Sequence, residues 1–180
     1  KIVAHEVHEA ESAEYAAQLI EQAVHREGVP HGVLVVHQDN GSPMKGSTYL
    51  AKLADLGIRP SYNRPGVSDD NAYAESLFRT CKYRPDFPGR FATPEEARAW
   101  MLTFTRWYNH EHKHRNLKFV SPAQRHRGEE RWLFAQRTAL YEQARAKHPA
   151  RWSGNIRNWS LPKEVWLNRP AQENVLREAA

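Results

Sequence analysis

The sequence predicts an α/β sandwich, because helical and strand patterns alternate along its first half. A continuous apolar run at residues 33–36 is typical of a strand that is buried on both faces of a sheet. A second short strand is expected at residues 58–62, and a partial one near residues 2–8. The predicted sheet is therefore incomplete, with two internal strands and part of a third.

Helix boundaries are marked by capping residues and by glycines. Ser12 is suited to cap a helix that Gly28 ends. Thr93 is suited to cap a later helix, in a capping box with Glu96. Helices are predicted over residues 12–28, 47–56, 68–83, 93–108 and 130–147.

The third predicted helix begins with a cluster of acidic residues. Ser68 is expected to cap it, with Asp69 and Asp70 in its first turn. Negative charge is favourable there, because the helix dipole is positive at the N-terminus. The helix then runs through Glu75 to about Tyr83.

Charge is spread unevenly along the 180 residues, whose formal net charge is +5. Residues 1–105 carry 11 Lys/Arg and 14 Asp/Glu, whereas residues 106–180 carry 15 and 7. All six tryptophans lie from Trp100 onward. A basic, aromatic C-terminal half is expected of a nucleic-acid-binding protein. A solvated basic face over a tryptophan-containing core is the alternative, and charge alone does not separate the two.

The composition also excludes several classes of protein. No apolar run approaches the roughly 20 residues that a bilayer span needs, so we expect no membrane partner. The N-terminal residues lack the basic-then-apolar pattern of a secretion signal. Cys81 is the single cysteine, which excludes an internal disulfide and fits a reducing cytosol.

Two acidic residues stand out as candidates for metal chemistry. Asp39 directly follows the strand predicted at residues 33–36, and ligands of open α/β sheets bind at the carboxyl ends of strands. Glu75 lies 36 positions further on, in the third predicted helix. Carboxylates are the ligands that Mg²⁺ prefers, and two such ions support phosphoryl transfer. As isolated residues, a loop-capping Asp39 and a solvated Glu75 are the better explanation.

The surroundings of Glu75 favour the functional interpretation. Asn71, Glu75, Arg79 and Lys82 fall on one helix face, at offsets of four, four and three. A carboxylate flanked by two cations suits a site that must also hold a phosphate backbone. Simple pairing of Glu75 with Arg79 is the alternative, and it stabilises a helix by only a few tenths of a kcal/mol.

Three segments resemble one known family. HQDNGSPMKG resembles the second-aspartate motif, and DDNAYAESLFRTCKYR the glutamate motif, of DDE-type insertion-sequence transposases in the retroviral integrase superfamily. The 35 residues between Asp39 and Glu75 match the spacing of that superfamily. WYNHEHKHRNLKFVSPAQRH resembles the region that follows the catalytic Glu. The resemblance covers roughly residues 1–170.

The resemblance implies a fold and a domain organisation. The fold is a ribonuclease H-like three-layer sandwich, here partial because the N-terminal strands are missing, with a helical and irregular basic C-terminal extension. Residues 1–126 are expected to form the C-terminal part of the catalytic core. Residues 127–180 are expected to form a basic, Trp- and Arg-rich extension and tail.

The resemblance also implies a metal site. Such enzymes bind two Mg²⁺ or Mn²⁺ ions with two Asp and one Glu, and Asp39 and Glu75 match the second and third of these ligands. No residue here matches the first Asp, which lies on the first strand of the sheet; Glu6, Glu9 and Glu11 are acidic but belong to the edge strand. We therefore expect this chain to be inactive alone, while a longer parent protein cleaves and joins DNA.

DNA contacts are implied for several residues. Arg79 and Lys82 match positions that approach the transposon or viral DNA end, and Asn71 is placed to bond substrate or a metal-bound water, or to cap the helix. Lys113 and Arg115 belong to a basic run with three alternating histidines, for which phosphate contact is expected more than metal binding. A solvated loop is the alternative there.

The expected partners are the double-stranded DNA of element ends and target, and further copies of the parent protein. A bacterial, cytoplasmic and nucleoid-associated location follows from the resemblance. Two other functions remain open: a non-catalytic DNA-binding remnant of a transposase, and a different ribonuclease H-like nuclease. In the tail, Trp166 is expected to anchor the chain, while Trp152 and Trp159 fit either packing or DNA stacking.

Overall fold

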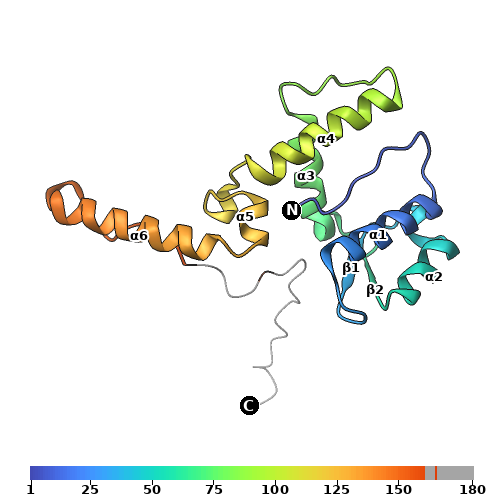
Figure 1. The fold of residues 1–180 in the computed structure, drawn as a ribbon, viewed down its shortest axis with the longest axis horizontal. Coiled ribbons are helices and arrows are strands. Elements are labelled where there is room, and N and C mark those ends of the chain that lie inside the picture. The colour runs from blue at the N-terminus through green and yellow to red at the C-terminus, as the bar shows by residue number, and fades with distance from the viewer. Residues whose placement is uncertain (161–164, 166–180) are drawn as a thin grey trace, which may run out of the picture.

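The computed structural model describes residues 1–160 and 165, apart from the side chains of residues 68 and 69 (Figure 1). Trp166 therefore lies outside the described residues. The helices and strands follow in the order α1 (Ala13–Glu27), β1 (Val35–Gln38), α2 (Ser47–Asp55), β2 (Arg59–Tyr62), α3 (Ala72–Lys82), α4 (Pro94–His110), α5 (Pro122–His126) and α6 (Glu130–Lys147). Short 3-10 turns occupy Ser42–Lys45, Ser68–Asn71, Arg115–Leu117 and Pro149–Arg151.

The two strands pair in parallel, with Val35 opposite Arg59 and Gln38 opposite Tyr62. A parallel pair needs a crossover connection, and α2 supplies it. The prediction that the first internal strand is buried on both faces is wrong: Val33 is 62% exposed and Val35 is 46% exposed. The described sheet has two strands, so nothing pairs with the edge of β1 that faces away from β2.

The partial strand expected near residues 2–8 is not formed within the described residues. This segment instead runs beside α4, where the Asn109 side chain substitutes for a strand partner. The Ile2 amide donates to Asn109 Oδ1 at 2.8 Å, and Asn109 Nδ2 donates to the Ile2 carbonyl at 2.9 Å. The backbone of Ile2 is therefore paired with a helix side chain and not with a strand.

The start of α3 also differs from the prediction. Residues 68–71 form a 3-10 turn, and the α-helix begins only at Ala72. Asp70 does not serve the helix dipole, because its carboxylate binds Arg64 in the preceding loop. Two other predicted caps are confirmed: Ser12 accepts from the first-turn amides of α1, and Thr93 accepts from Glu96 N. The capping box predicted at Thr93 is not completed, because the Glu96 carboxylate accepts from the Ala92 amide instead.

A first core joins α1, α2 and the sheet. Tyr49 and Leu53 of α2 pack with Ala17 of α1 and with Ile58, which precedes β2. Gly46 permits the close approach of the two helices, since a Cβ there would lie 2.4 Å from the Ala13 Cβ. This core places the carboxyl end of β1 on a rigid support.

Further along the chain, α4 and α6 carry separate aromatic clusters. In α4, Phe104 is buried and stacks on Trp100 with ring centroids 5.2 Å apart. The arm formed by α6 extends away from the sheet (Figure 1). Trp159 is buried against this arm, stacked on Phe134 and Tyr141, so it is a packing residue of the extension.

Leu53→Ala tests the first core, in which Leu53 is 1% exposed. We expect the substitution to lower the free energy of unfolding by about 2–5 kcal/mol, because it leaves a cavity in a packed core. Leu50→Ala, on the same helix but 36% exposed, is the matched control and should cost less than half as much. Urea denaturation measures both, and equal losses would contradict the described packing.

Candidate active site

The site begins at Asp39, the first residue after β1. Its carboxylate is exposed, and Oδ1 accepts a hydrogen bond from the Gly41 amide at 2.9 Å. The preceding residue, Gln38, is buried and holds the strand end from two sides. Gln38 Oε1 accepts from the Tyr49 hydroxyl at 2.7 Å, and its Nε2 donates to the Met44 carbonyl at 3.3 Å. The Asp39 backbone is therefore fixed while its side chain reaches solvent.

Glu75 lies in the first turn of α3, with its side chain exposed. The start of that helix is held by an ion pair in the loop that leads to it. The Arg64 amide and guanidinium both donate to the Asp70 carboxylate, with Nη2 2.7 Å from Oδ1 and the amide N 2.7 Å from Oδ2. These donors lower the pKa of Asp70 from 3.8 to about 2, so the carboxylate stays ionised.

His37 connects the strand that precedes Asp39 with the turn that precedes Glu75. Its Nε2 lies 3.0 Å from the Asp70 carbonyl oxygen, and its Nδ1 lies 3.0 Å from Ser61 Oγ. A carbonyl only accepts, so Nε2 carries a proton. One imidazole thereby joins β1, β2 and the turn before α3. His37 is two residues before Asp39, and Asp70 is five before Glu75, so this ring links the strand that leads to Asp39 with the turn that leads to Glu75.

The donor set suits a hard divalent cation. Mg²⁺ is commonly held by one or two carboxylates, completed by waters and substrate phosphates. Asp39 and Glu75 are exposed carboxylates of this kind. No group of three or more His, Cys, Asp or Glu side chains that could hold a metal is present among the described residues. The described chain therefore offers two candidate ligands and not a closed metal site.

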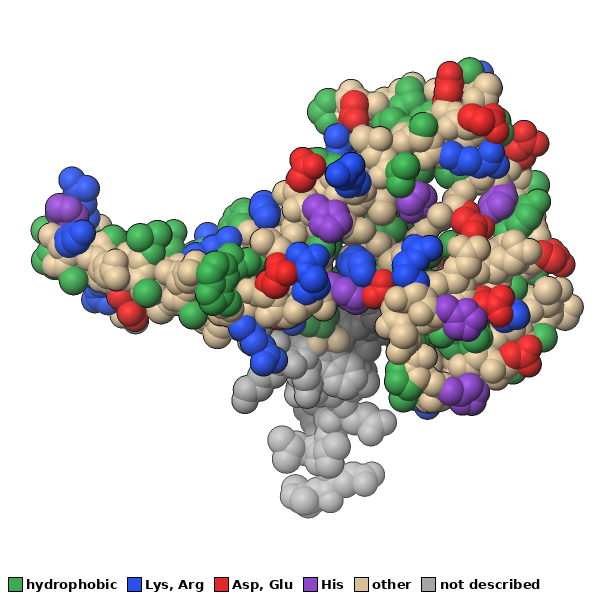
Figure 2. All heavy atoms as spheres, viewed as in Figure 1, with side chains coloured by type: hydrophobic (Ala, Val, Ile, Leu, Met, Phe, Trp, Pro, Cys, Tyr) green, Lys and Arg blue, Asp and Glu red, His purple; other side chains and the backbone are tan. Residues whose placement is uncertain are grey.

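The cationic candidates of α3 lie at the surface. Arg79 and Lys82 are exposed, and the Arg79 guanidinium lies 5.9 Å from the ring centroid of Tyr83. Asn71 occupies the N-cap position of α3 but makes no capping hydrogen bond with its side chain. Figure 2 shows Lys, Arg and His side chains gathered in the middle of one face, between the α6 arm and the sheet.

The histidine run does not form one basic surface. The rings of His112 and His114 lie 4.3 Å apart and pack on Tyr108. Burial lowers the pKa of both histidines, that of His114 to about 4, so both are neutral at pH 7. Lys113 donates to Gln124 Oε1 at 3.1 Å, and Arg115 is exposed. Lys113 and Arg115 are thus the exposed cations of this run, and the exposed carboxylate of Glu111 lies beside them.

The structural comparison identifies the fold. The catalytic core domain of BIV integrase aligns with a TM-score of 0.51 at 23% sequence identity, over 72% of this chain and 80% of that one. The fold is that of an integrase catalytic core, which is ribonuclease H-like, and this chain shows part of it. The predicted fold class is therefore confirmed.

Sequence comparisons indicate the family. Residues 56–122 match the family model described as the integrase core domain. The chain is similar to the transposase for insertion sequence element IS904 of Lactococcus lactis, 33% identical over 52% of this chain and 37% of that protein. It is also similar to an uncharacterized transposase-like protein of Haemophilus influenzae, 29% identical over 68% and 56%.

A further relative is the putative transposase for insertion sequence element IS986/IS6110 of Mycobacterium tuberculosis, 32% identical over 58% of this chain and 40% of that protein. The chain thus spans between about a third and somewhat more than half of the length of these relatives. By sequence, this chain is similar to transposases of insertion sequences. The predicted resemblance is confirmed.

Two residues of the site were not found by sequence reasoning. Asp70 is predicted to serve the helix dipole, but its buried carboxylate instead pairs with the exposed Arg64 guanidinium. His37 carried no signal at all, because its partners Ser61 and Asp70 are 24 and 33 residues away. One local pattern could have indicated the Arg64–Asp70 contact: the two opposite charges are six residues apart and flank a Pro-Gly turn.

Arg64→Gln tests the support of α3. The low pKa of Asp70 means that this ion pair contributes to stability above about pH 4, and that its contribution is lost as the pH falls toward 2. We expect the protection factors of residues 63–72 at pH 7 to be lower in Arg64→Gln than in the unmodified chain, and this difference to disappear as the pH falls from about 4 toward 2. The matched control is Arg59→Gln, at an exposed position of β2; equal exchange in both variants would refute the role given to Arg64.

Proposed function

We propose that this chain is the C-terminal part of the catalytic core of a transposase, whose parent protein cleaves a DNA phosphodiester and joins the 3′ end to target DNA. The observation that carries the proposal is the bridge through His37, which ties the strand before Asp39 to the turn before Glu75. It supports a shared role for Asp39, at the carboxyl end of a parallel strand, and Glu75, in the first turn of α3.

In this proposal Asp39 and Glu75 hold Mg²⁺ or Mn²⁺, which, when bound, polarises the phosphate and the attacking oxygen. The residues of this chain position the DNA. Arg79 and Lys82, exposed on the same helix as Glu75, contact the phosphate backbone, and the Asn71 amide binds substrate at the start of that helix. Lys113 and Arg115 extend the phosphate contacts beyond α4.

Two carboxylates provide less negative charge to a metal ion than the three acidic ligands of a complete site. The described residues contribute no third ligand. We propose that the chain alone does not cleave DNA, and that activity belongs to a longer protein, which self-associates to hold two DNA ends. The division into a core at residues 1–126 and a basic extension at residues 127–180 is part of the same proposal, as is a location in the bacterial cytoplasm, at the nucleoid.

A second candidate function is non-catalytic DNA binding. The excess of 15 Lys/Arg over 7 Asp/Glu in residues 106–180 favours it, because phosphate attraction requires no metal. No helix in the described part of the chain is long and apolar enough to cross a membrane. The two functions differ in what Asp39 and Glu75 do, and metal binding separates them.

Mn²⁺ titration followed by NMR tests the metal site in this chain. We expect weak binding that broadens the amide signals near Asp39 and Glu75, and we expect this local broadening to be lost in Asp39→Asn and in Glu75→Gln. Asp55→Asn, at an exposed carboxylate in the last turn of α2, is the control and should keep it. Broadening that survives both site substitutions would assign the metal elsewhere and leave only the DNA-binding function.

Lys82→Gln tests the phosphate contacts. We expect weaker binding to duplex DNA of any sequence, and a slope of log K against log salt that is smaller by about one, because one phosphate contact is lost. Arg59→Gln removes the same charge from the exposed surface of β2 and should leave the slope unchanged. Fluorescence anisotropy at several salt concentrations measures both, and equal slopes in the two variants would remove Lys82 from the interface.

A further inference from the structure

The α6 arm is covered on one side and open on the other. On the covered side, Phe134 and Tyr141 pack against the buried ring of Trp159. Away from that side, Trp132 is 63% exposed and Leu140 is 64% exposed. A surface helix normally turns its apolar residues toward a core and its charged residues toward solvent. The open side of α6 departs from this rule.

The open side carries a line of uncharged residues, which we call the α6 seam. All are exposed, and they follow one another at offsets of four, three, four and three: Trp132, Gln136, Ala139, Gln143 and Ala146. This alternation keeps side chains on one side of a helix, and it is the spacing at which two helices pack along their length. The six charged residues of α6 all lie outside the seam: Glu130, Arg131, Arg137, Glu142, Arg145 and Lys147.

The seam is more than an isolated exposed ring. A single exposed apolar side chain is common on protein surfaces and needs no partner. Here Trp132 stands in line with small and amide side chains over about 21 Å, at a rise of 1.5 Å per residue. The arm extends away from the sheet, and the seam is exposed along its length (Figure 1). A second helix can therefore lie along it.

The lack of charge indicates which partner fits the seam. DNA is attracted by Lys and Arg, and the seam contains neither. The seam is, however, complementary to itself. Antiparallel pairing of two α6 helices places Trp132 of one copy against Gln143 of the other, between the small side chains of Ala139 and Ala146. Large side chains that face small ones pack closely, and a two-fold axis repeats each contact.

We propose that two copies of this chain associate through the α6 seam, which packs against the same seam of the second copy about a two-fold axis. Leu140 adds apolar surface at the edge of the contact. The inference rests on the proposed function, in which a longer protein self-associates, and it names the surface that does so. The paired length is short for a protein interface, so the dimer dissociates on dilution.

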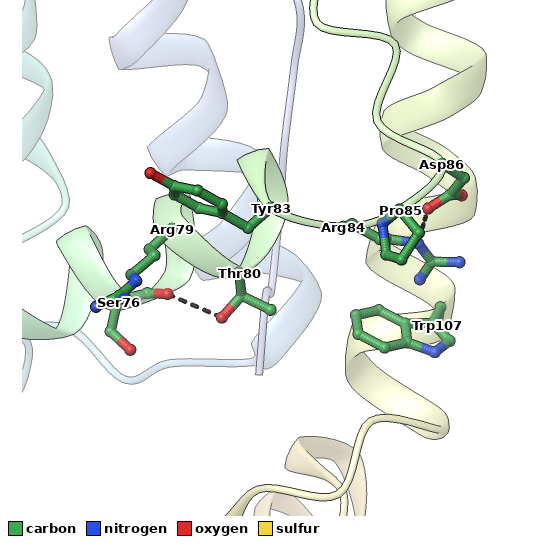
Figure 3. Close-up of a pocket in the computed structure, with 8 residues that line it drawn as sticks. All are labelled: Ser76, Arg79, Thr80, Tyr83, Arg84, Pro85, Asp86 and Trp107. Atoms are coloured by element: carbon green, nitrogen blue, oxygen red, sulfur yellow. Dashed lines mark hydrogen bonds and ion pairs between the residues drawn. The ribbon is translucent and has the colours of Figure 1, made fainter.

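Sedimentation velocity of this chain, without DNA or metal, tests the α6 seam. We expect the weight-average mass to rise from that of one chain towards that of two between ~1 and ~200 µM. Association should persist in about 0.5 M NaCl, because the seam has no charges for salt to screen. Trp132→Ala should weaken association about tenfold, which corresponds to ~1.4 kcal/mol. The matched control is Tyr83→Ala, which removes an exposed ring that points away from Trp107 and should leave association unchanged (Figure 3).

A charge exchange at Ala139 tests the two-fold pairing, because Ala139 lies in the middle of the seam. Ala139→Glu and Ala139→Lys should each be monomeric, since like charges then meet across the axis. An equimolar mixture of the two variants should restore the dimer. Ala139 is exposed, so far-UV circular dichroism should show unchanged helix in both variants. Ala99→Glu, at an exposed position of α4, is the control and should associate like the unmodified chain.

Three results overturn the α6 seam and leave the metal and DNA predictions of the proposed function standing. They are a monomer at every concentration, association that salt abolishes, and association that survives both Trp132→Ala and Ala139→Glu. A mixture of the Ala139 variants that stays monomeric overturns the two-fold pairing. Loss of the predicted metal and DNA binding with an intact, Trp132-dependent dimer counts against the proposed function and not against the seam.

Discussion

The geometry of the candidate site depends on the imidazole of His37. Its Nε2–H donates to the Asp70 carbonyl, while its Nδ1 meets Ser61 Oγ, so one ring is bonded to three segments of the chain. Each such hydrogen bond contributes only about 0.5–1.5 kcal/mol to stability. Its importance is geometric, because no other described hydrogen bond links β1 directly to the turn that precedes α3. Without it, the turn before α3 would keep its tie to Arg64, in the loop that follows β2, but would lose its direct hydrogen bond to β1.

The carboxylates around this ring have two distinct environments. Asp70 is almost fully buried, receives several donors from Arg64, and has a strongly lowered pKa. Asp39 and Glu75 are exposed and keep oxygen atoms directed to solvent. A buried, paired carboxylate cannot exchange its partner for a metal or a phosphate at low cost, whereas an exposed one can. This difference in environment explains why the three acidic residues have different roles, one structural and two proposed as ligands.

The basic C-terminal half likewise divides into packing and surface charges. Arg137 and Arg157 lie over the Trp159 ring, 5.1 and 4.9 Å from its centroid, and thereby help to hold the tail on α6. Charges used in this way are less available to DNA than exposed residues such as Lys82. Net charge alone therefore overstates the DNA-binding surface, and the positions of individual cations decide where strands can lie.

The sequence by itself determined the local features of this protein. Helix limits at Ser12, Gly28 and Thr93 were predictable because capping involves neighbours within a few residues, and the spacing of Asp39 and Glu75 is a property of the chain. Their ligand role remains a prediction. Tertiary structure decided the features that join distant segments.

Among those long-range features are the docking of Ile2 on Asn109, the exposure of Val35, and the bridge through His37. Hydrophobic patterns record whether a residue prefers burial, but they do not record which partner covers it. For that reason the apolar alternation near the N-terminus predicted a strand, although in the folded chain the Ile2 backbone is hydrogen-bonded to the Asn109 side chain of α4.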